Sequence, residues 1–349
     1  MTQDFTKVVL MTLAALGLLF ASCSSDDDNG GMTGTEGLER DRHALVVNEG
    51  GFQQANSSLG VLDLDTREYL PNQFAEISEN SLGDIFQSIY LKEERAYLVI
   101  NNSSKIEILN LETLEHEGTI ADLGSPRYMV SQGSNAWVSA LFDEAIHAID
   151  LNTGEIIGQI DFPGWSEEMI FHGENLLVTC PDCHHKYLLN PETGAILDSV
   201  FTGENTHILR ALDDGRILSF NSGSFDGSHE PVLRLFNQDL DLLDSLVIDD
   251  LSYIGAADLN ETSDRFYFAG TDVKYIEIEA GGLSQVNTAF STEEPFSVYQ
   301  LTSGPEGKIY LTDARDFSSL GQVYVYSAQG DQLYQFEAGV VPSRVNFYQ

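Results

Sequence analysis

The sequence predicts an all-β fold, a seven-bladed β-propeller of four-stranded antiparallel blades, and three observations support this prediction. A pattern of four short apolar strands recurs about every 40 residues from His43 onward. Its strands alternate β-branched or aromatic residues with polar ones, and no stretch has the periodicity of a long helix. Turns with Asp or Asn shortly before Thr-Gly recur ahead of the fourth strand, where Gly can adopt a positive φ. Four short strands per repeat are typical of a propeller blade.

Seven blades follow from counting the second strand of each repeat. These strands are expected at residues 44–48, 96–100, 136–139, 176–179, 216–220, 265–269 and 308–312. Blade one has no inner strand before Ala44, and residues 342–348 can supply it. That closure would remove the open sheet edges that favour aggregation. Residues 41–349 are therefore expected to form one propeller domain.

The N-terminal segment has the features of a lipoprotein signal peptide. Lys7 precedes an apolar run over residues 8–20, which is shorter than the roughly 20 residues of a membrane-spanning helix. Ala21 and Ser22 then precede Cys23, as in a bacterial lipobox. We expect residues 1–22 to be removed and Cys23 to carry the lipid, which makes the membrane attachment a lipid anchor only. An ordinary secretory signal with an incidental cysteine is the alternative.

Residues 23–40 have the composition of an acidic, flexible tether. Gly and Ser make such a segment flexible, and the charges of Asp26, Asp27 and Asp28 repel one another. An acidic tract after the lipid-bearing cysteine also resembles the export signal of surface-displayed lipoproteins, although a plain spacer would have the same composition. We expect a lipid-anchored protein of the outer membrane that faces the cell exterior.

The composition excludes several functions. The 349 residues include 55 Asp and Glu against 17 Lys and Arg, which gives a formal net charge of −38. Nucleic acids and anionic membrane surfaces are bound through clustered basic residues, so neither is an expected partner. The sequence contains no G-x-S-x-G, P-loop or H-E-x-x-H motif. Adjacent acidic pairs are expected by chance in so acidic a chain, so no enzyme activity is predicted.

Four segments carry a resemblance to a known family: residues 46–52, 82–89, 99–108 and 125–128. They resemble YVTN-type (YncE-like) surface propellers and, more narrowly, the corrinoid-capturing BtuG-type lipoproteins. The resemblance implies a surface lipoprotein that binds cobalamin or another corrinoid and passes it to a TonB-dependent outer-membrane transporter. It implies no catalysis and no required cofactor. A propeller that binds glycans, proteins or metal ions remains the alternative.

A ligand-binding face follows from the strand order. In a four-stranded blade, the loop between the second and third strands shares a face with the loops that join blades. Aromatic and polar side chains recur in these loops, and a corrin ring with peripheral amides requires this mixture of flat apolar contact and hydrogen bonds. The predicted face residues are Phe52, Gln53, Asn101, Asn102, Arg127, Tyr128, Phe142, Trp165, His184, His185, Phe225 and Phe317. Alternatively, such rings pack neighbouring blades and the Asn residues stabilise turns.

The segment Cys180-Pro181-Asp182-Cys183-His184 allows three interpretations. Cys-x-x-Cys-His is the attachment motif of c-type haem, with His184 as axial ligand. Cys180, Cys183 and His184 could instead bind Zn²⁺ or a copper ion. The third interpretation, a local disulfide that braces the loop in an oxidising compartment, is the one that we favour. Under the corrinoid interpretation, His184 or His185 could also contact the ligand or its cobalt.

Overall fold

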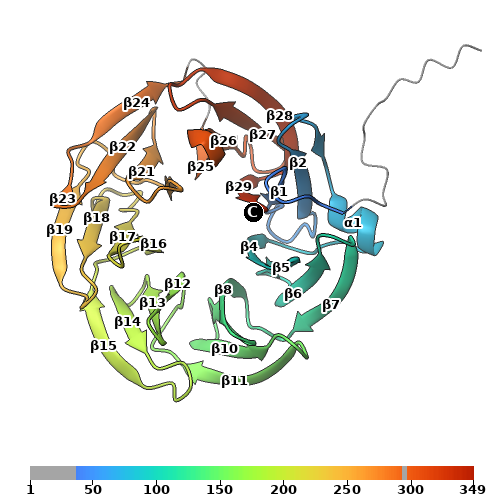
Figure 1. The fold of residues 1–349 in the computed structure, drawn as a ribbon, viewed down its shortest axis with the longest axis horizontal. Coiled ribbons are helices and arrows are strands. Elements are labelled where there is room, and N and C mark those ends of the chain that lie inside the picture. Colours follow the sequence, from blue (N-terminus) through green and yellow to red (C-terminus); the bar gives the residue numbers. More distant parts are fainter. Residues whose placement is uncertain (1–36, 293–296) are drawn as a thin grey trace, which may run out of the picture. The chain divides into compact units, whose positions relative to one another are not determined.

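The computed structural model describes residues 37–292 and 297–349. The predicted signal peptide, Cys23 and residues 24–36 of the predicted tether lie outside the described residues. The rest folds into seven antiparallel sheets arranged in a ring, which confirms the predicted seven-bladed β-propeller (Figure 1). The inner strands lie nearest the axis of the ring and the outer strands form the perimeter (Figure 1). Residues from all seven blades line a cavity along this axis, which we call the central channel.

Blades 1 to 4 each contain four strands, named in order from the channel outward. Blade 1 contains β29 (Pro342–Phe347), β1 (His43–Asn48), β2 (Ser58–Asp63) and β3 (Tyr69–Leu70). Blade 2 contains β4 (Phe86–Lys92), β5 (Arg95–Ile100), β6 (Lys105–Asn110) and β7 (Glu115–Ala121). Blade 3 contains β8 (Pro126–Gln132), β9 (Asn135–Ala140), β10 (Ala145–Asp150) and β11 (Glu155–Asp161). Blade 4 contains β12 (Met169–His172), β13 (Asn175–Cys180), β14 (His185–Leu189) and β15 (Ile196–Phe201).

Blades 5 to 7 follow the same order, with one irregular outer edge. Blade 5 contains β16 (Thr206–Ala211), β17 (Ile217–Asn221), β18 (Val232–Phe236) and β19 (Leu242–Val247). Blade 6 contains β20 (Ala256–Leu259), β21 (Arg265–Ala269) and β22 (Asp272–Glu279), and its outer edge is divided between β23 (Gly282–Leu283) and β24 (Asn287–Ser291). Blade 7 contains β25 (Val298–Ser303), β26 (Ile309–Asp313), β27 (Leu320–Tyr326) and β28 (Gln332–Val340).

The repeated turns form for the predicted reason. Oδ1 of Asn190 accepts hydrogen bonds from the backbone N–H groups of Glu192 and Thr193, at 3.0 and 2.9 Å. Gly194 then takes φ = 71°, a conformation that costs other residues free energy. Asp150 and Gly154 repeat the arrangement one blade earlier, with an Asp150 Oδ1 to Asn152 N distance of 2.8 Å. The side-chain acceptor and the glycine together end the third strand and start the fourth.

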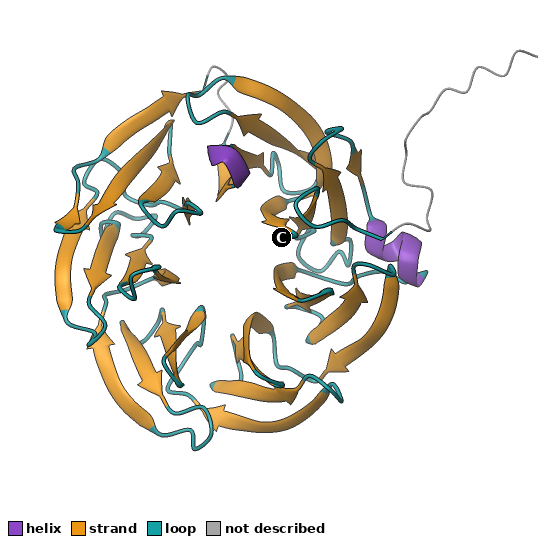
Figure 2. Cartoon of the chain, viewed as in Figure 1, coloured by secondary structure: helices purple, strands orange, loops and turns teal. Residues whose placement is uncertain are grey.

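The C-terminal strand closes the ring, as the sequence predicts. β29 pairs antiparallel with β1, so the last residues of the chain supply the inner strand of the first blade. Four strands are then complete in blade 1, although β3 has only two residues. The six-residue helix α1 (Gln73–Ser78) follows β3 in the connection to blade 2 (Figure 2). A one-turn 3₁₀ segment (Pro305–Gly307) joins β25 to β26.

The hydrophobic core lies between neighbouring blades. One cluster joins blades 5 and 6, where the rings of Phe220 and Phe266 lie 5.0 Å apart. Another joins blades 7 and 1, where the ring of Tyr310 contacts that of Phe347. Each fully buried aromatic side chain contributes about 1.5–3 kcal/mol of hydrophobic stabilisation. No helix of the described chain is both long and apolar enough to span a membrane.

The two faces of the ring differ in their loops, and both ends of the packed chain lie on one of them. We call the face with the interblade loops and the loops between second and third strands the top face, and the opposite face the bottom face. The backbone N–H of Leu38 donates to the carbonyl of Leu111, in the bottom-face turn between β6 and β7. Leu38 is buried, so the packed body begins before residue 41. Arg40 also donates to the carbonyl of Gln349, so the start and the end of the packed chain lie together.

Candidate ligand-binding face

The top face carries four strongly exposed phenylalanines, all of them predicted from the sequence. Their exposed fractions are 66% for Phe52, 75% for Phe142, 84% for Phe225 and 57% for Phe317. Each lies in a loop between the second and third strands of its blade. Most of the surface of each ring is therefore exposed to solvent, which makes this face the candidate for ligand binding.

Two of these rings are paired with tyrosines that the sequence did not single out. Phe225 stacks on Tyr253 with ring centroids 3.9 Å apart, and Phe317 meets Tyr299 edge to face at 5.6 Å. Tyr253 comes from the connection between blades 5 and 6, and Tyr299 from inner strand β25. These two phenylalanines and two tyrosines therefore form two preorganised aromatic pairs on the side of the face formed by blades 5 to 7.

A hydrogen-bonded cluster surrounds Arg127 at the mouth of the channel. Its guanidinium contacts both carboxylate oxygens of Glu167, at 2.9 and 2.6 Å, and donates to Gln87. The indole N–H of Trp165 donates to the same carboxylate, and Arg127 lies 5.5 Å from the Trp165 ring. Burial alone would lower the pKa of Arg127, but the Glu167 carboxylate outweighs burial and the pKa is raised. The predicted residues Arg127 and Trp165 are thus brought together.

Two further ionisable groups complete the channel mouth. Arg210 of β16 contacts Glu168 at 2.5 Å and Asp258 at 3.9 Å. Burial raises the pKa of Glu49, against hydrogen bonds from Tyr299 and Ser343 that lower it. The Tyr299 hydroxyl donates to Oε2 of Glu49 at 2.8 Å. Glu168 and Asp258 are therefore paired with Arg210, and Glu49 is hydrogen-bonded to Tyr299.

Three hollows adjoin one another at this face. The first, of about 500 Å³, is lined by Trp165, His207, Phe225 and Tyr253 among others. The second, of about 900 Å³, shares Phe225 and Tyr253 with the first and extends to Tyr299. The third, of about 370 Å³, lies in the channel. The Phe225–Tyr253 pair thus forms the wall between the two surface hollows.

The other predicted face residues have varied surroundings. Asn101 is buried, and its amide donates to the carbonyls of Ser125 and Pro126, which fixes the entry to blade 3. The Asn102 amide and the backbone N–H of Gln53 both donate to Asp84. The ring of His185 contacts Phe201 and Tyr187 within its own blade. Tyr128 lines the channel.

The Cys180 loop contains a disulfide. Cys180 and Cys183 are bonded to each other with Cα atoms 5.1 Å apart, and Cys180 is fully buried. Neither sulfur is free to bind a metal ion or to form a thioether to haem, although Asp182 lies beside both. Nε2 of His184 lies 3.8 Å from Oε1 of Glu204, and the other carboxylate oxygen, Oε2, lies 3.0 Å from Nδ1 of His229.

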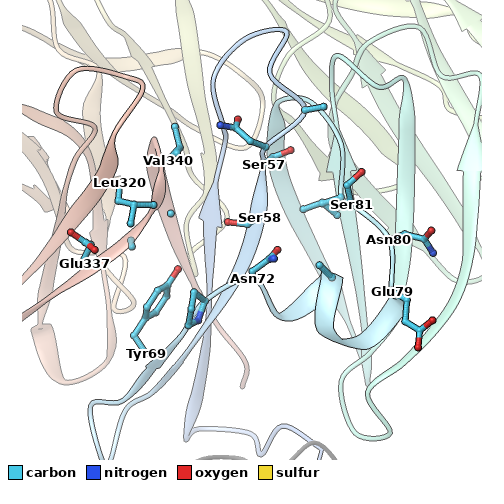
Figure 3. A pocket seen from close by; sticks show the side chains of 17 residues that line it. Ser57, Ser58, Tyr69, Asn72, Glu79, Asn80, Ser81, Leu320, Glu337 and Val340 are labelled. Atoms are coloured by element: carbon cyan, nitrogen blue, oxygen red, sulfur yellow. The ribbon is translucent and has the colours of Figure 1, made fainter. Parts of the chain in front are cut away.

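A separate cavity of about 720 Å³ lies at the perimeter, between blades 1 and 7 (Figure 3). It lies beside β3, the two-residue outer strand of blade 1. Figure 3 shows Tyr69, Asn72 and Glu337 around it, with the short helix α1 on one side. None of the predicted face residues lines this cavity.

Comparisons with known proteins identify the fold and do not identify the family. No protein-family model matches the chain, and no curated protein matches it. A quinoprotein alcohol dehydrogenase-like protein from Bacteroides thetaiotaomicron is similar in structure, with a TM-score of 0.66 and 14% identity over 88% of this chain and 78% of that chain. The narrower YncE-like and BtuG-type assignment has no counterpart among these comparisons.

Two further solved structures share the fold. Hydrazine synthase of Kuenenia stuttgartiensis gives a TM-score of 0.56 at 13% identity, over 67% of this chain and 74% of that chain. The computationally designed protein Ika8 also gives 0.56, at 14% identity over 88% and 92%. A synthase, a dehydrogenase-like protein and a design thus share one architecture. Enzymes occur in this fold, so the function has to be argued from the site itself.

Proposed function

We propose that this protein captures a corrinoid on its top face without catalysing a reaction. The observation that supports the proposal is the pair of hollows, of about 500 and 900 Å³, on either side of the Phe225–Tyr253 stack. A corrin ring is wide, flat and largely apolar, and aromatic side chains bind such surfaces with little loss of conformational entropy. The resemblance of the first three blades to corrinoid-capturing lipoproteins points to the same class of ligand.

Polar groups suited to peripheral amides surround these aromatic rings. Asn205, His207 and Ser228 line the smaller hollow, and Gln300 and Arg315 line the larger one. Burial lowers the pKa of His207, which favours the neutral imidazole, able both to donate and to accept a hydrogen bond. Apolar surface with a few placed polar groups is the usual composition of a small-molecule site.

The state of the acids at the channel mouth favours binding over catalysis. A carboxylate that acts as a general base must reach the proton that it removes. Glu167 is held by Arg127 and Trp165, Glu168 by Arg210, and Glu49 by Tyr299. We propose no reaction, no resident cofactor and no metal at this face.

The experiment uses the two tryptophans of the chain. Trp165 lines the smaller hollow, whereas Trp137 is buried within blade 3. In a Trp137→Phe background, the emission of Trp165 should be quenched by cobalamin in a saturable manner. Phe225→Ala combined with Tyr253→Ala should weaken binding at least tenfold. Phe142→Ala is the matched control, because this exposed ring lines neither hollow.

The result that would overturn the proposal is equally specific. If cobalamin is not retained on desalting and does not quench Trp165, the corrinoid assignment is wrong. Equal loss in the Phe142 control would place the ligand elsewhere. Retention of a glycan or a protein at the Phe225–Tyr253 pair in place of cobalamin would favour the alternative binding module.

We further propose that the captured corrinoid is passed to a TonB-dependent outer-membrane transporter. This part of the proposal rests on the lipobox at Cys23 and the acidic tract after it, together with the family resemblance. A lipid-anchored protein facing the exterior would hold its cargo near the transporter.

A further inference from the structure

The closing strand β29 places two unpaired hydrogen-bond donors in the central channel. Arg344 and Asn346 are two residues apart on β29, so their side chains lie on the same side of the strand. Both line the channel cavity of about 370 Å³. The Arg344 side chain forms no hydrogen bond or ion pair within residues 37–292 and 297–349, and Nδ2 of Asn346 is buried without a partner there.

A third donor reaches the same cavity from blade 3. The guanidinium of Arg127 donates to the Gln87 side-chain oxygen, which fixes the orientation of that amide. The Gln87 nitrogen therefore faces the Tyr128 hydroxyl and donates to its oxygen at 3.4 Å. The phenolic hydrogen is left to point elsewhere, and no acceptor for it exists among the described residues. Tyr128 and Arg344 lie close enough to interact electrostatically.

Burial keeps this phenol protonated. It raises the pKa of Tyr128 to about 12, and the nearby acids Glu167 and Glu168 act in the same direction. The hydroxyl is therefore a donor across the neutral range.

The acids of the channel do not compensate Arg344. Glu168 and Asp258 are both in contact with Arg210, and Asp258 also accepts the backbone N–H of Ser303. Burial raises the pKa of Glu49, which already accepts the Tyr299 hydroxyl. The half-buried guanidinium of Arg344 therefore has no carboxylate partner in the channel and can pair with an anion from solution.

We propose that the central channel binds a small oxyanion, a carboxylate or a phosphate group, between Arg344, Asn346 and Tyr128. A guanidinium fork presents two parallel N–H groups to such an anion, and the amide and phenol supply further donors. The cavity holds one such group with several waters, each of which occupies about 30 Å³. The channel site does not depend on which ligand occupies the hollows of the top face.

The test measures binding of inorganic phosphate and of acetate by calorimetry, at constant ionic strength and near neutral pH. Wild-type protein should bind at least one of the two, and Arg344→Gln should weaken that binding at least tenfold. Arg265→Gln is the matched control, because Arg265 begins strand β21, lines neither the channel nor the surface hollows, and pairs with Glu277. It should bind as the wild type does. The anion that binds more tightly distinguishes a phosphate site from a carboxylate site.

Tyr128→Phe provides a second, milder variant that removes only the phenolic hydroxyl. Tyr128→Phe should weaken anion binding several-fold with an unchanged melting temperature. If Arg344→Gln does not fold, this variant alone tests whether the channel binds the anion. The proposal is wrong if neither anion binds the wild type, or if binding survives both channel variants. Equal weakening by Arg265→Gln would also reject it, because nonspecific attraction to surface cations would then explain the binding.

Discussion

The backbone N–H of Gly339 donates a hydrogen bond of 2.9 Å to Oδ1 of Asn48, 291 residues earlier in the chain. Asn48 is fully buried, and its amide nitrogen also donates to the carbonyl of Ser58 and to the Tyr69 hydroxyl. One side chain thus joins the last strand of blade 7 to the first blade. A Cβ at residue 339 would lie only 2.6 Å from Cγ of Asn48, so a glycine is required there.

Asn48→Ala should destabilise the ring, because it leaves buried polar groups of Gly339 and Ser58 without partners. We expect a loss of about 2–4 kcal/mol in the free energy of unfolding, measured by urea denaturation. Asn152→Ala is the control, because Asn152 is exposed in a turn and should change stability by less than about 0.5 kcal/mol. A similar small change for Asn48→Ala would show that closure does not depend on this side chain.

Lys186→Met should stabilise the protein and flatten the pH dependence of its stability. Lys186 is completely buried, its Nζ has no hydrogen-bond partner in the described chain, and it lies 2.9 Å from the centroid of the Phe236 ring. Burial, with a smaller effect of Arg234, lowers the pKa of Lys186 to about 6. A methionine fills similar space without the cost of burying an amine.

The sign of the pH effect follows from proton binding. With a lowered pKa in the fold, the unfolded chain binds more protons than the folded one above about pH 6. The Lys186 contribution therefore raises stability as pH increases, by up to about 1.4 kcal/mol per pH unit. Unfolding measured between pH 6.5 and 8.5 should show this slope in the wild type and in Lys308→Met, but not in Lys186→Met. An unchanged slope in Lys186→Met would contradict the assignment.

Removing the Cys180–Cys183 disulfide should lower stability and leave ligand capture largely intact. The bridge closes a short loop, so Cys180→Ser with Cys183→Ser should cost on the order of 1–3 kcal/mol. Thermal unfolding and cobalamin retention are measured on the same samples. Loss of cobalamin retention with an unchanged melting temperature would instead assign this loop to the ligand.

Glu167→Ala should destabilise strongly, because it leaves the Arg127 guanidinium buried without its carboxylate. We expect about 3–5 kcal/mol from this change. The double variant Arg127→Met, Glu167→Leu removes both charges, so its loss in the free energy of unfolding should be smaller than that of Glu167→Ala. A double variant less stable than Glu167→Ala would show that the ion pair contributes more than its hydrophobic replacement.

Cys23→Ala should release the protein from the membrane fraction, since the lipid would lose its attachment site. Fractionation of cells followed by immunoblotting measures this. Continued retention in the membrane fraction would count against the lipobox, whereas release together with lower cobalamin uptake would support the proposed hand-off.

The repeat could be predicted because strand alternation and turn chemistry are local properties. All seven second strands lie where the sequence placed them, and residues 342–347 close blade 1. Helix α1 was missed, because its six residues are too few to establish a helical period. The divided outer edge of blade 6 was missed as well, since β23 has only two residues.

The positions of the exposed rings could be predicted, but the side chains that pair with them could not. Loop position alone identifies Phe225 and Phe317 as surface rings. Their partners Tyr253 and Tyr299 could not be found, because pairing depends on how neighbouring blades approach each other. The channel donors Arg344 and Asn346 were missed for the same reason: strand alternation does not reveal which residues face one another across a ring.

The contact between Leu38 and Leu111, together with the nearby Gln349, has a practical consequence. Both ends of the packed body emerge on the face away from the aromatic hollows. Protein immobilised on a sensor chip through either end would therefore present those hollows to the flowing solution. Binding kinetics could then be measured without the support hindering access to Phe225 and Tyr253.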